Sequence, residues 1–182
     1  MVIFQKRVAD LAESALARFI ARARQAAGLK ATVDVLVTSN TEMKSLNRRF
    51  RKMDKATDVL AFPAEQGDGK SPSAGEGRNA SAGEIAISAE IAHQNARALG
   101  HTTAEEVKIL VLHGILHLRG YDHERDSGQM ARREQQLRAR LGLPDGLIER
   151  AFKDAGMRVA KSAINGNKRR ISTQRAQRKP SR

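Results

Sequence analysis

Apolar and polar residues are distributed along the chain in a pattern that predicts both helices and strands. Apolar residues recur at helical spacing from Phe4 to Ala27, with Gly28 as a stop, and the β-branched run 31–38 predicts a strand. The same criteria predict further helices that begin at Asn40 and cover 88–99, 103–118 and 127–141, and strands at 58–62 and 84–87. The expected fold is α+β, with a small mixed β-sheet of three to four strands backed by about five helices.

The helix expected between Thr103 and Leu118 is the most informative element. Thr103 and Glu106 form a capping-box pattern, and almost every residue from Val107 onward is apolar. A helix that is apolar all round is buried in the protein core. Its two histidines, His113 and His117, must therefore find partners inside the protein.

Composition limits the classes of protein that are possible. A chain of 182 residues is long enough for one domain with its own core. The chain has no cysteine, which excludes disulfides and thiolate metal ligands. Residues 1–20 contain five charged side chains, so we expect neither a signal peptide nor a membrane span. The protein is expected to be cytoplasmic, with no membrane partner.

The chain is expected to divide near residue 146. Residues 1–146 form the predicted domain, in which the Gly- and Ser-rich segment 64–82 is a flexible loop. Residues 147–182 form a basic extension that is expected to be largely disordered. Of the formal charge of +13, the last 30 residues (153–182) carry +9, from 10 Lys/Arg and one acid. Such a tail either binds nucleic acid or is a solvated end that aids solubility.

Three of the five histidines lie within eleven residues, in the sequence HGILHLRGYDH. His113 and His117 are four apart on the expected helix, so both rings leave the same face. Gly120 permits a sharp turn after the helix, and His123 can fold back as a third ligand. This spacing predicts one Zn²⁺ ion at the end of the buried helix, with an open coordination position for water. The alternative is that these histidines are hydrogen-bonded core residues.

The spacing of these histidines is also that of the metzincin peptidases, so a metalloprotease is one candidate function. Those enzymes carry a general-base glutamate directly after the first histidine. Here that position is Gly114, which disfavours peptide hydrolysis.

Phosphodiester cleavage is the second candidate, because the chain offers cations for a phosphate. The segment 48–52 (RRFRK) supplies several, and an arginine can pair with phosphate through two hydrogen bonds. The alternative interpretation of this segment is a solvated helix face. A third candidate, given the resemblance described next, is a non-catalytic ribosome-assembly factor with a structural metal.

Three blocks of the sequence resemble the YbeY family of bacterial rRNA-maturation endoribonucleases. They are residues 46–63 (LNRRFRKMDKATDVLAFP), 83–88 (GEIAIS) and 113–123 (HGILHLRGYDH). The resemblance covers roughly residues 8–142. It implies a single-strand-specific, zinc-dependent endoribonuclease that acts in 16S rRNA 3′-end maturation and ribosome quality control. Its implied partners are ribosomal RNA and the small ribosomal subunit, with no small-molecule cofactor.

The resemblance also implies roles for individual residues. His113, His117 and His123 hold the zinc ion, His113 and His117 act in catalysis, and Arg51 matches the functional arginine of the family. Asp122 is either an acceptor that orients a ligand imidazole or only a turn residue.

The chain departs from the family in four places. Family members begin with a strand, whereas this chain starts almost in its first helix. Either the sheet is one strand short, or the sequence begins downstream of the natural start. Ala56 and Ala61 replace Pro and Ser, and the loop 64–82 is longer than usual.

Overall fold

Four strands form one mixed sheet in the computed structural model, which describes residues 1–64, 80–122 and 126–144. The strands are β1 (Val2–Phe4), β2 (Thr32–Thr38), β3 (Val59–Pro63) and β4 (Ser81–Ser88). Their order in the sheet is β1-β2-β4-β3. β1, β2 and β4 run parallel, and β3 pairs antiparallel with β4 at the edge.

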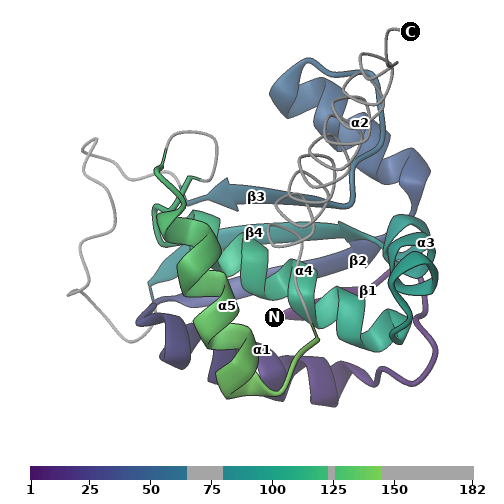
Figure 1. The fold of residues 1–182 in the computed structure, drawn as a ribbon. Helices are drawn as coiled ribbons and strands as arrows, with labels where there is room; N and C mark the ends of the chain where they lie inside the picture. Colours follow the sequence, from purple (N-terminus) through teal and green to yellow (C-terminus); the bar gives the residue numbers. More distant parts are fainter. Residues whose placement is uncertain (65–79, 123–125, 145–182) are drawn as a thin grey trace, which may run out of the picture. The chain divides into compact units, whose positions relative to one another are not determined.

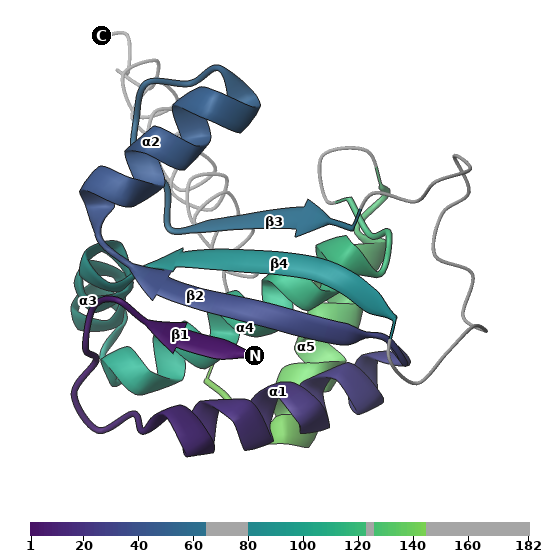
Figure 2. The same ribbon diagram turned by 180° about the vertical axis from the view of Figure 1, so that it is seen from behind.

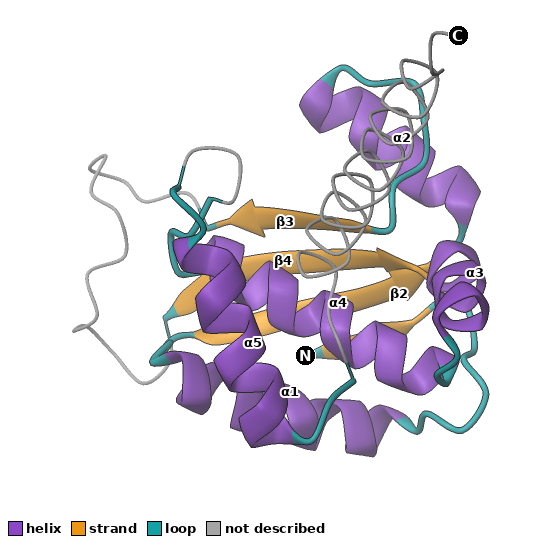
Figure 3. Ribbon diagram, viewed as in Figure 1, coloured by secondary structure: helices purple, strands orange, loops and turns teal. Residues whose placement is uncertain are grey.

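Five helices accompany this sheet in the described residues: α1 (Glu13–Ala27), α2 (Asn40–Arg51), α3 (Ala89–Leu99), α4 (Thr103–Leu118) and α5 (Gln129–Leu141). α1, α4 and α5 lie on one face of the sheet (Figures 1 and 3). α4 is central, since it contacts β3, β4, α1, α3 and α5. The predicted α+β fold is therefore confirmed.

The main core lies between α4 and the sheet. Val33, Val35 and Val37 alternate along β2 and are buried, as are Ile85 and Ile87 on β4. Side chains of a strand point alternately to its two faces, so these five residues share the face that α4 covers. On α4 itself, the whole run from Ile109 to Leu112 is inaccessible to solvent.

Among the described residues, those that cover the opposite face of the sheet lie at one end of it. There α2 packs Met43 against Leu60 and Ala86, with Leu46 and Phe62 at the border. The view from behind shows that α2 lies beyond the strand ends, near β3, and that none of the described helices crosses the middle of this face (Figure 2).

The expected start of the first helix is wrong, and so is the expectation of a missing strand. β1 precedes α1 and pairs in parallel with residues 35–37 of β2. The backbone reverses at Asp10, which has a left-handed φ of 58°, before α1 begins at Glu13. Val8 and Leu11 lie in this connection and are buried, and their spacing of three residues resembles that of a helix. A strand of three residues is too short for its alternation to be visible in the sequence.

Other boundaries shift by smaller amounts. The capping box of α4 is formed by Thr102 and Glu105, one residue before the predicted pair. Ser39 rather than Asn40 caps α2, by accepting a hydrogen bond from the Glu42 backbone N–H. Most of the segment predicted as a flexible loop, residues 65–79, lies outside the described residues, and so does the extension 147–182. No helix in the described part of the chain has the length and apolarity needed to cross a membrane.

Candidate metal and phosphate site

His113 and His117 bring two ring nitrogens together at the C-terminal end of α4. The Nε2 atoms lie 3.1 Å apart, and the ring centroids are separated by 4.8 Å. His113 is buried and His117 is partly exposed. The two rings therefore converge on one point at the border of the core, as their spacing of four residues predicts.

The other nitrogen of His113 is held by a carboxylate from the neighbouring helix. Nδ1 of His113 lies 3.0 Å from Oε2 of Glu134 on α5, and both side chains are buried. Oε1 of the same carboxylate lies 3.6 Å from Nε of Arg138, which keeps the buried charge paired. An acceptor at Nδ1 fixes the proton there, so that Nε2 of His113 presents its lone pair toward His117.

This arrangement fits a metal ion. Two ligand nitrogens at 2.0–2.1 Å from a tetrahedral zinc ion lie about 3.3 Å apart, close to the separation of the two Nε2 atoms. A carboxylate on the second nitrogen of a ligand histidine is also the usual companion of a metal. Two facing nitrogen lone pairs repel each other unless a cation or a proton lies between them.

The third predicted ligand, His123, lies outside the described residues. Within residues 1–64, 80–122 and 126–144, no group of three His, Cys, Asp or Glu side chains is placed to hold a metal ion. The described part of the site thus consists of two imidazoles and the carboxylate behind one of them. The ligand set of three histidines stays a prediction.

Sequence reasoning missed Glu134. Its signal is an acid on the buried face of α5, among Met130, Leu137 and Arg138. A buried carboxylate requires a hydrogen-bonding or ionic partner, which the sequence does not identify. Two roles were predicted for Asp122, an acceptor that orients a ligand imidazole or only a turn residue. Its backbone oxygen accepts a hydrogen bond from the Asp126 N–H, which is the turn role that was the alternative. Its action on a ligand imidazole stays a prediction.

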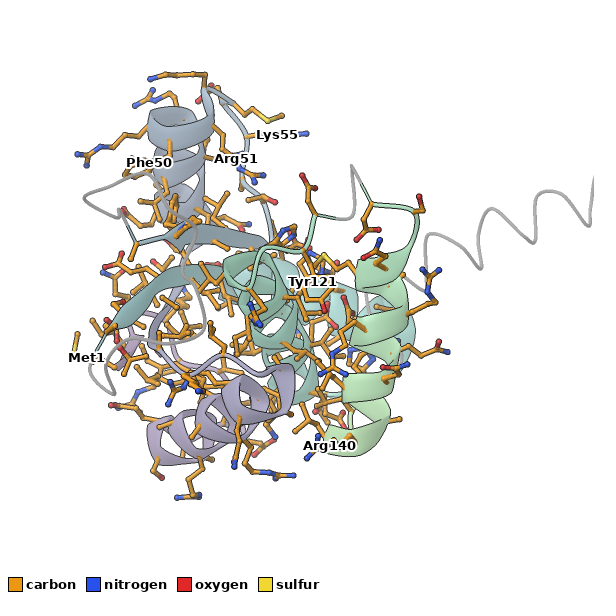
Figure 4. All side chains as sticks on the ribbon, turned by 90° about the vertical axis from the view of Figure 1, so that its left-hand side faces the viewer. Met1, Phe50, Arg51, Lys55, Tyr121 and Arg140 are labelled. Atoms are coloured by element: carbon orange, nitrogen blue, oxygen red, sulfur yellow. The ribbon has the colours of Figure 1, made fainter. Side chains whose placement is uncertain are left out.

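Arg51 is the last residue of α2, and the chain around it is tightly held. Lys52 adopts a left-handed φ of 60° and ends the helix. Asn47, which is buried, donates from Nδ2 to the backbone oxygen of Lys55 at 2.8 Å. The turn that follows α2 is therefore fixed against the helix. Figure 4 shows Arg51 and Lys55 on the side of α2 toward Tyr121, which follows α4, while Phe50 lies on the other side.

Positive charge is concentrated at this end of α2. Residues 48–55 contain five Lys or Arg side chains and one acid, Asp54, and all six are exposed. Asp54 pairs with Lys44 across the turn at 3.2 Å. The surplus of exposed cations is suited to binding a phosphate chain.

Gly114 occupies the position that carries the general base in the metzincin peptidases. A Cβ atom at this position would lie 2.8 Å from Cδ1 and 2.9 Å from Cγ2 of Ile85 on β4. A side chain here would point into the sheet rather than into the site. The glycine is therefore needed for the close contact between α4 and β4, and no general base can stand there.

The sequence is similar to a known family of proteins over most of its length. Residues 2–142 match the family model described as Endoribonuclease YbeY. The chain is 52% identical over 155 residues to an Endoribonuclease YbeY from Koribacter versatilis, covering 85% of this chain and 94% of that protein. It is 46% identical over 149 residues to the one from Solibacter usitatus, covering 82% and 92%.

A solved structure shares the fold. It is the solution structure of TM1509 from Thermotoga maritima, with a TM-score of 0.50 and 28% identity, covering 78% of this chain and 89% of the other. The match of the family model over most of the chain, together with relatives at this level of identity, shows that the chain belongs to the YbeY family of endoribonucleases.

Proposed function

We propose that this protein is a zinc-dependent endoribonuclease that cleaves single-stranded RNA at the site of His113, His117 and His123. Its proposed role is 16S rRNA 3′-end maturation and ribosome quality control, with ribosomal RNA and the small ribosomal subunit as partners. The observation that carries the proposal is the convergence of the two Nε2 atoms at 3.1 Å, with Glu134 behind His113. A shared proton would also hold these two nitrogens together, and a metal in addition gives a role to the carboxylate behind His113.

Each residue of the site has its own role in the proposed reaction. When bound, the ion stabilises negative charge on a phosphoryl oxygen and provides a nucleophile at neutral pH. His113 and His117 orient the ion, and the Glu134 carboxylate holds the ring of His113 in one tautomer. The Arg51 guanidinium neutralises the scissile phosphate through paired hydrogen bonds. The exposed cations of residues 48–55 bind the adjacent phosphates without reading the sequence.

Peptide hydrolysis is disfavoured on physical grounds. It requires a general base to accept the proton of the nucleophile and pass it to the leaving amine. The position of that base is Gly114, which lies against Ile85. Cleavage of a phosphodiester places more negative charge on the reacting oxygens than cleavage of a peptide does. Arg51 and its neighbouring cations can stabilise that charge.

A cleavage assay on single-stranded rRNA fragments tests the proposal. Wild type, Arg51→Ala and His117→Ala are compared, with a casein assay for peptidase activity. We expect Arg51→Ala to lose RNA cleavage while it keeps its metal, and His117→Ala to lose both. Equal cleavage by all three preparations would point to a contaminant and favour a non-catalytic assembly factor. End-group analysis of the products distinguishes hydrolysis from attack by the 2′-hydroxyl.

A further inference from the structure

The face of the sheet opposite α4 contains an open groove of about 570 Å³. Its floor is formed by the strands, including Leu36, Phe62 and Ala86, and the α2 residues Leu46, Arg49 and Phe50 form one wall. These three α2 residues are spaced three and four apart, so they share one helix face. Arg51 falls on a different face of α2, toward Tyr121 (Figure 4). One helix thus separates the groove from the proposed phosphate contact.

Phe50 is unusual for a large apolar side chain because it is 54% exposed at the wall of this groove. Its ring contacts Phe62, with centroids 4.9 Å apart, and the guanidinium of Arg49 lies 5.2 Å from its centroid. The ring is therefore held on one side and flanked by a cation, while more than half of its surface remains open. Such an aromatic ring with an adjacent arginine is suited to stacking on a planar ring that carries a phosphate.

The groove is lined by charged residues of both signs. Arg49 is the cation of the α2 wall, and it belongs to the exposed segment 48–55. The strands contribute two acids, Asp34 and Glu84, and Asp34 is paired with the amino terminus of Met1. A polyanion therefore meets favourable charge only at the α2 wall. Besides apolar side chains, the lining away from α2 contains these two carboxylates and the polar residues Gln5 and Ser81. Such a lining favours an uncharged group that carries N–H donors, as a nucleobase does.

We propose that this groove is a second RNA subsite, in which an unpaired nucleobase next to the scissile phosphate stacks on Phe50. The proposal rests on the proposed endoribonuclease function. Single-stranded RNA passes over the end of α2, with one phosphate at Arg51 and a neighbouring base in the groove. Because a base in a duplex is already stacked and paired, this subsite accepts only unpaired RNA. The groove thereby accounts for single-strand specificity.

Binding of a single-stranded oligoribonucleotide that contains 2-aminopurine tests this subsite, with fluorescence followed by stopped flow before cleavage accumulates. We expect Phe50→Ala to weaken binding about tenfold and to abolish the fluorescence quenching at one position of the probe. Phe50→Tyr keeps an aromatic ring and is expected to bind like wild type. Leu99→Ala, which removes an exposed apolar side chain at the end of α3, is the matched control and leaves affinity unchanged.

Two further measurements separate stacking from charge. An abasic linker is moved along the RNA, and at one position it is expected to weaken binding to wild type but not to Phe50→Ala. The slope of affinity against salt concentration is expected to be the same for both proteins, because no charge is removed. Unchanged affinity in Phe50→Ala, as for a groove that binds a peptide, would overturn the proposal. So would equal sensitivity of both proteins to the abasic linker at every position.

The outcome is independent of the cleavage reaction. Phe50-dependent quenching in a protein that does not cleave RNA would retain the subsite and reject the endoribonuclease function. Cleavage of single-stranded RNA with no dependence of binding on Phe50 would retain the endoribonuclease function and reject the subsite.

Discussion

The Glu134 carboxylate on α5 accepts a hydrogen bond from Nδ1 of His113 on α4, at 3.0 Å and across 21 residues of sequence. This contact joins the two helices at the proposed metal site. It orients a ligand that the neighbouring His117 alone could not hold in place. The proposed metal site therefore depends on α5 as well as on α4.

Replacing Glu134 by Gln is expected to weaken zinc binding about 10- to 100-fold. The amide keeps the size of the side chain but removes the charge that favours the ligand form of His113. Competition with a chromogenic chelator measures the dissociation constant. Arg140→Ala, an exposed change on the same helix, is the control (Figure 4). Wild-type zinc affinity in folded Glu134→Gln would remove the carboxylate from the metal site.

Arg51→Ala is expected to lower kcat for RNA cleavage by about 10²–10³, the usual loss when one donor to the transition-state charge is removed. Zinc content is expected to stay at the wild-type level, because the Arg51 side chain is on α2, whereas His113 and His117 are on α4. Arg48→Ala removes an equal charge from the same helix and is expected to change mainly KM. An equal drop of kcat in both variants would assign Arg51 to general electrostatic binding.

Gly114→Ala is expected to lower the free energy of unfolding by about 1–2 kcal/mol, although alanine is the better helix former by about 1 kcal/mol. The new Cβ would lie 2.9 Å from Cγ2 of Ile85, an atom that cannot swing away without the side chain changing its rotamer. Urea denaturation measures the loss. In an Ile85→Ala background the same substitution is expected to cost nothing. A penalty of equal size in both backgrounds would mean that the contact with Ile85 is not its cause.

The start of α4 is expected to give a pH-dependent contribution to stability. Hydrogen bonds from the backbone N–H and the hydroxyl of Thr102 lower the pKa of Glu105 below its usual value. The ionised carboxylate is thus favoured in the folded state. Its contribution is present above the pKa of the unfolded chain and is lost as the pH falls through the lower pKa of the folded state.

Chemical denaturation of Glu105→Gln and wild type between pH 7 and pH 3 measures this contribution. The variant is expected to be the less stable protein at pH 7, and the difference is expected to shrink at acidic pH. Because Glu105 is partly exposed, the effect should be smaller than the loss of about 1 kcal/mol expected for Thr102→Ala, which removes the cap itself. A difference that does not change with pH would contradict the ionic origin of the effect.

The sequence predicted those parts of the fold that depend on local pattern. α4 and the convergence of His113 and His117 follow from apolar composition and a spacing of four. The glycine stop predicted after α1 also holds, since Gly28 has a left-handed φ of 75°. In each case the residues on which the prediction rests lie within or next to a single helix.

Features that depend on pairing between distant segments were not predictable. β1 is a strand only because residues 35–37 are there to pair with it. Glu134 reads as a surface acid of an amphipathic helix until α5 is packed against α4. The close packing of Gly114 against Ile85 likewise becomes visible only when α4 lies on β4. These contacts are long-range, and a single sequence does not contain their geometry.

Metal analysis of the protein, purified without any chelator, tests the central claim most directly. Mass spectrometry of wild type is expected to find a single divalent ion per chain, and His113→Ala and His117→Ala, each checked for folding by circular dichroism, are expected to have lost it. A wild-type protein without a stoichiometric ion, or a full metal content in both folded variants, would contradict a metal site at these two histidines.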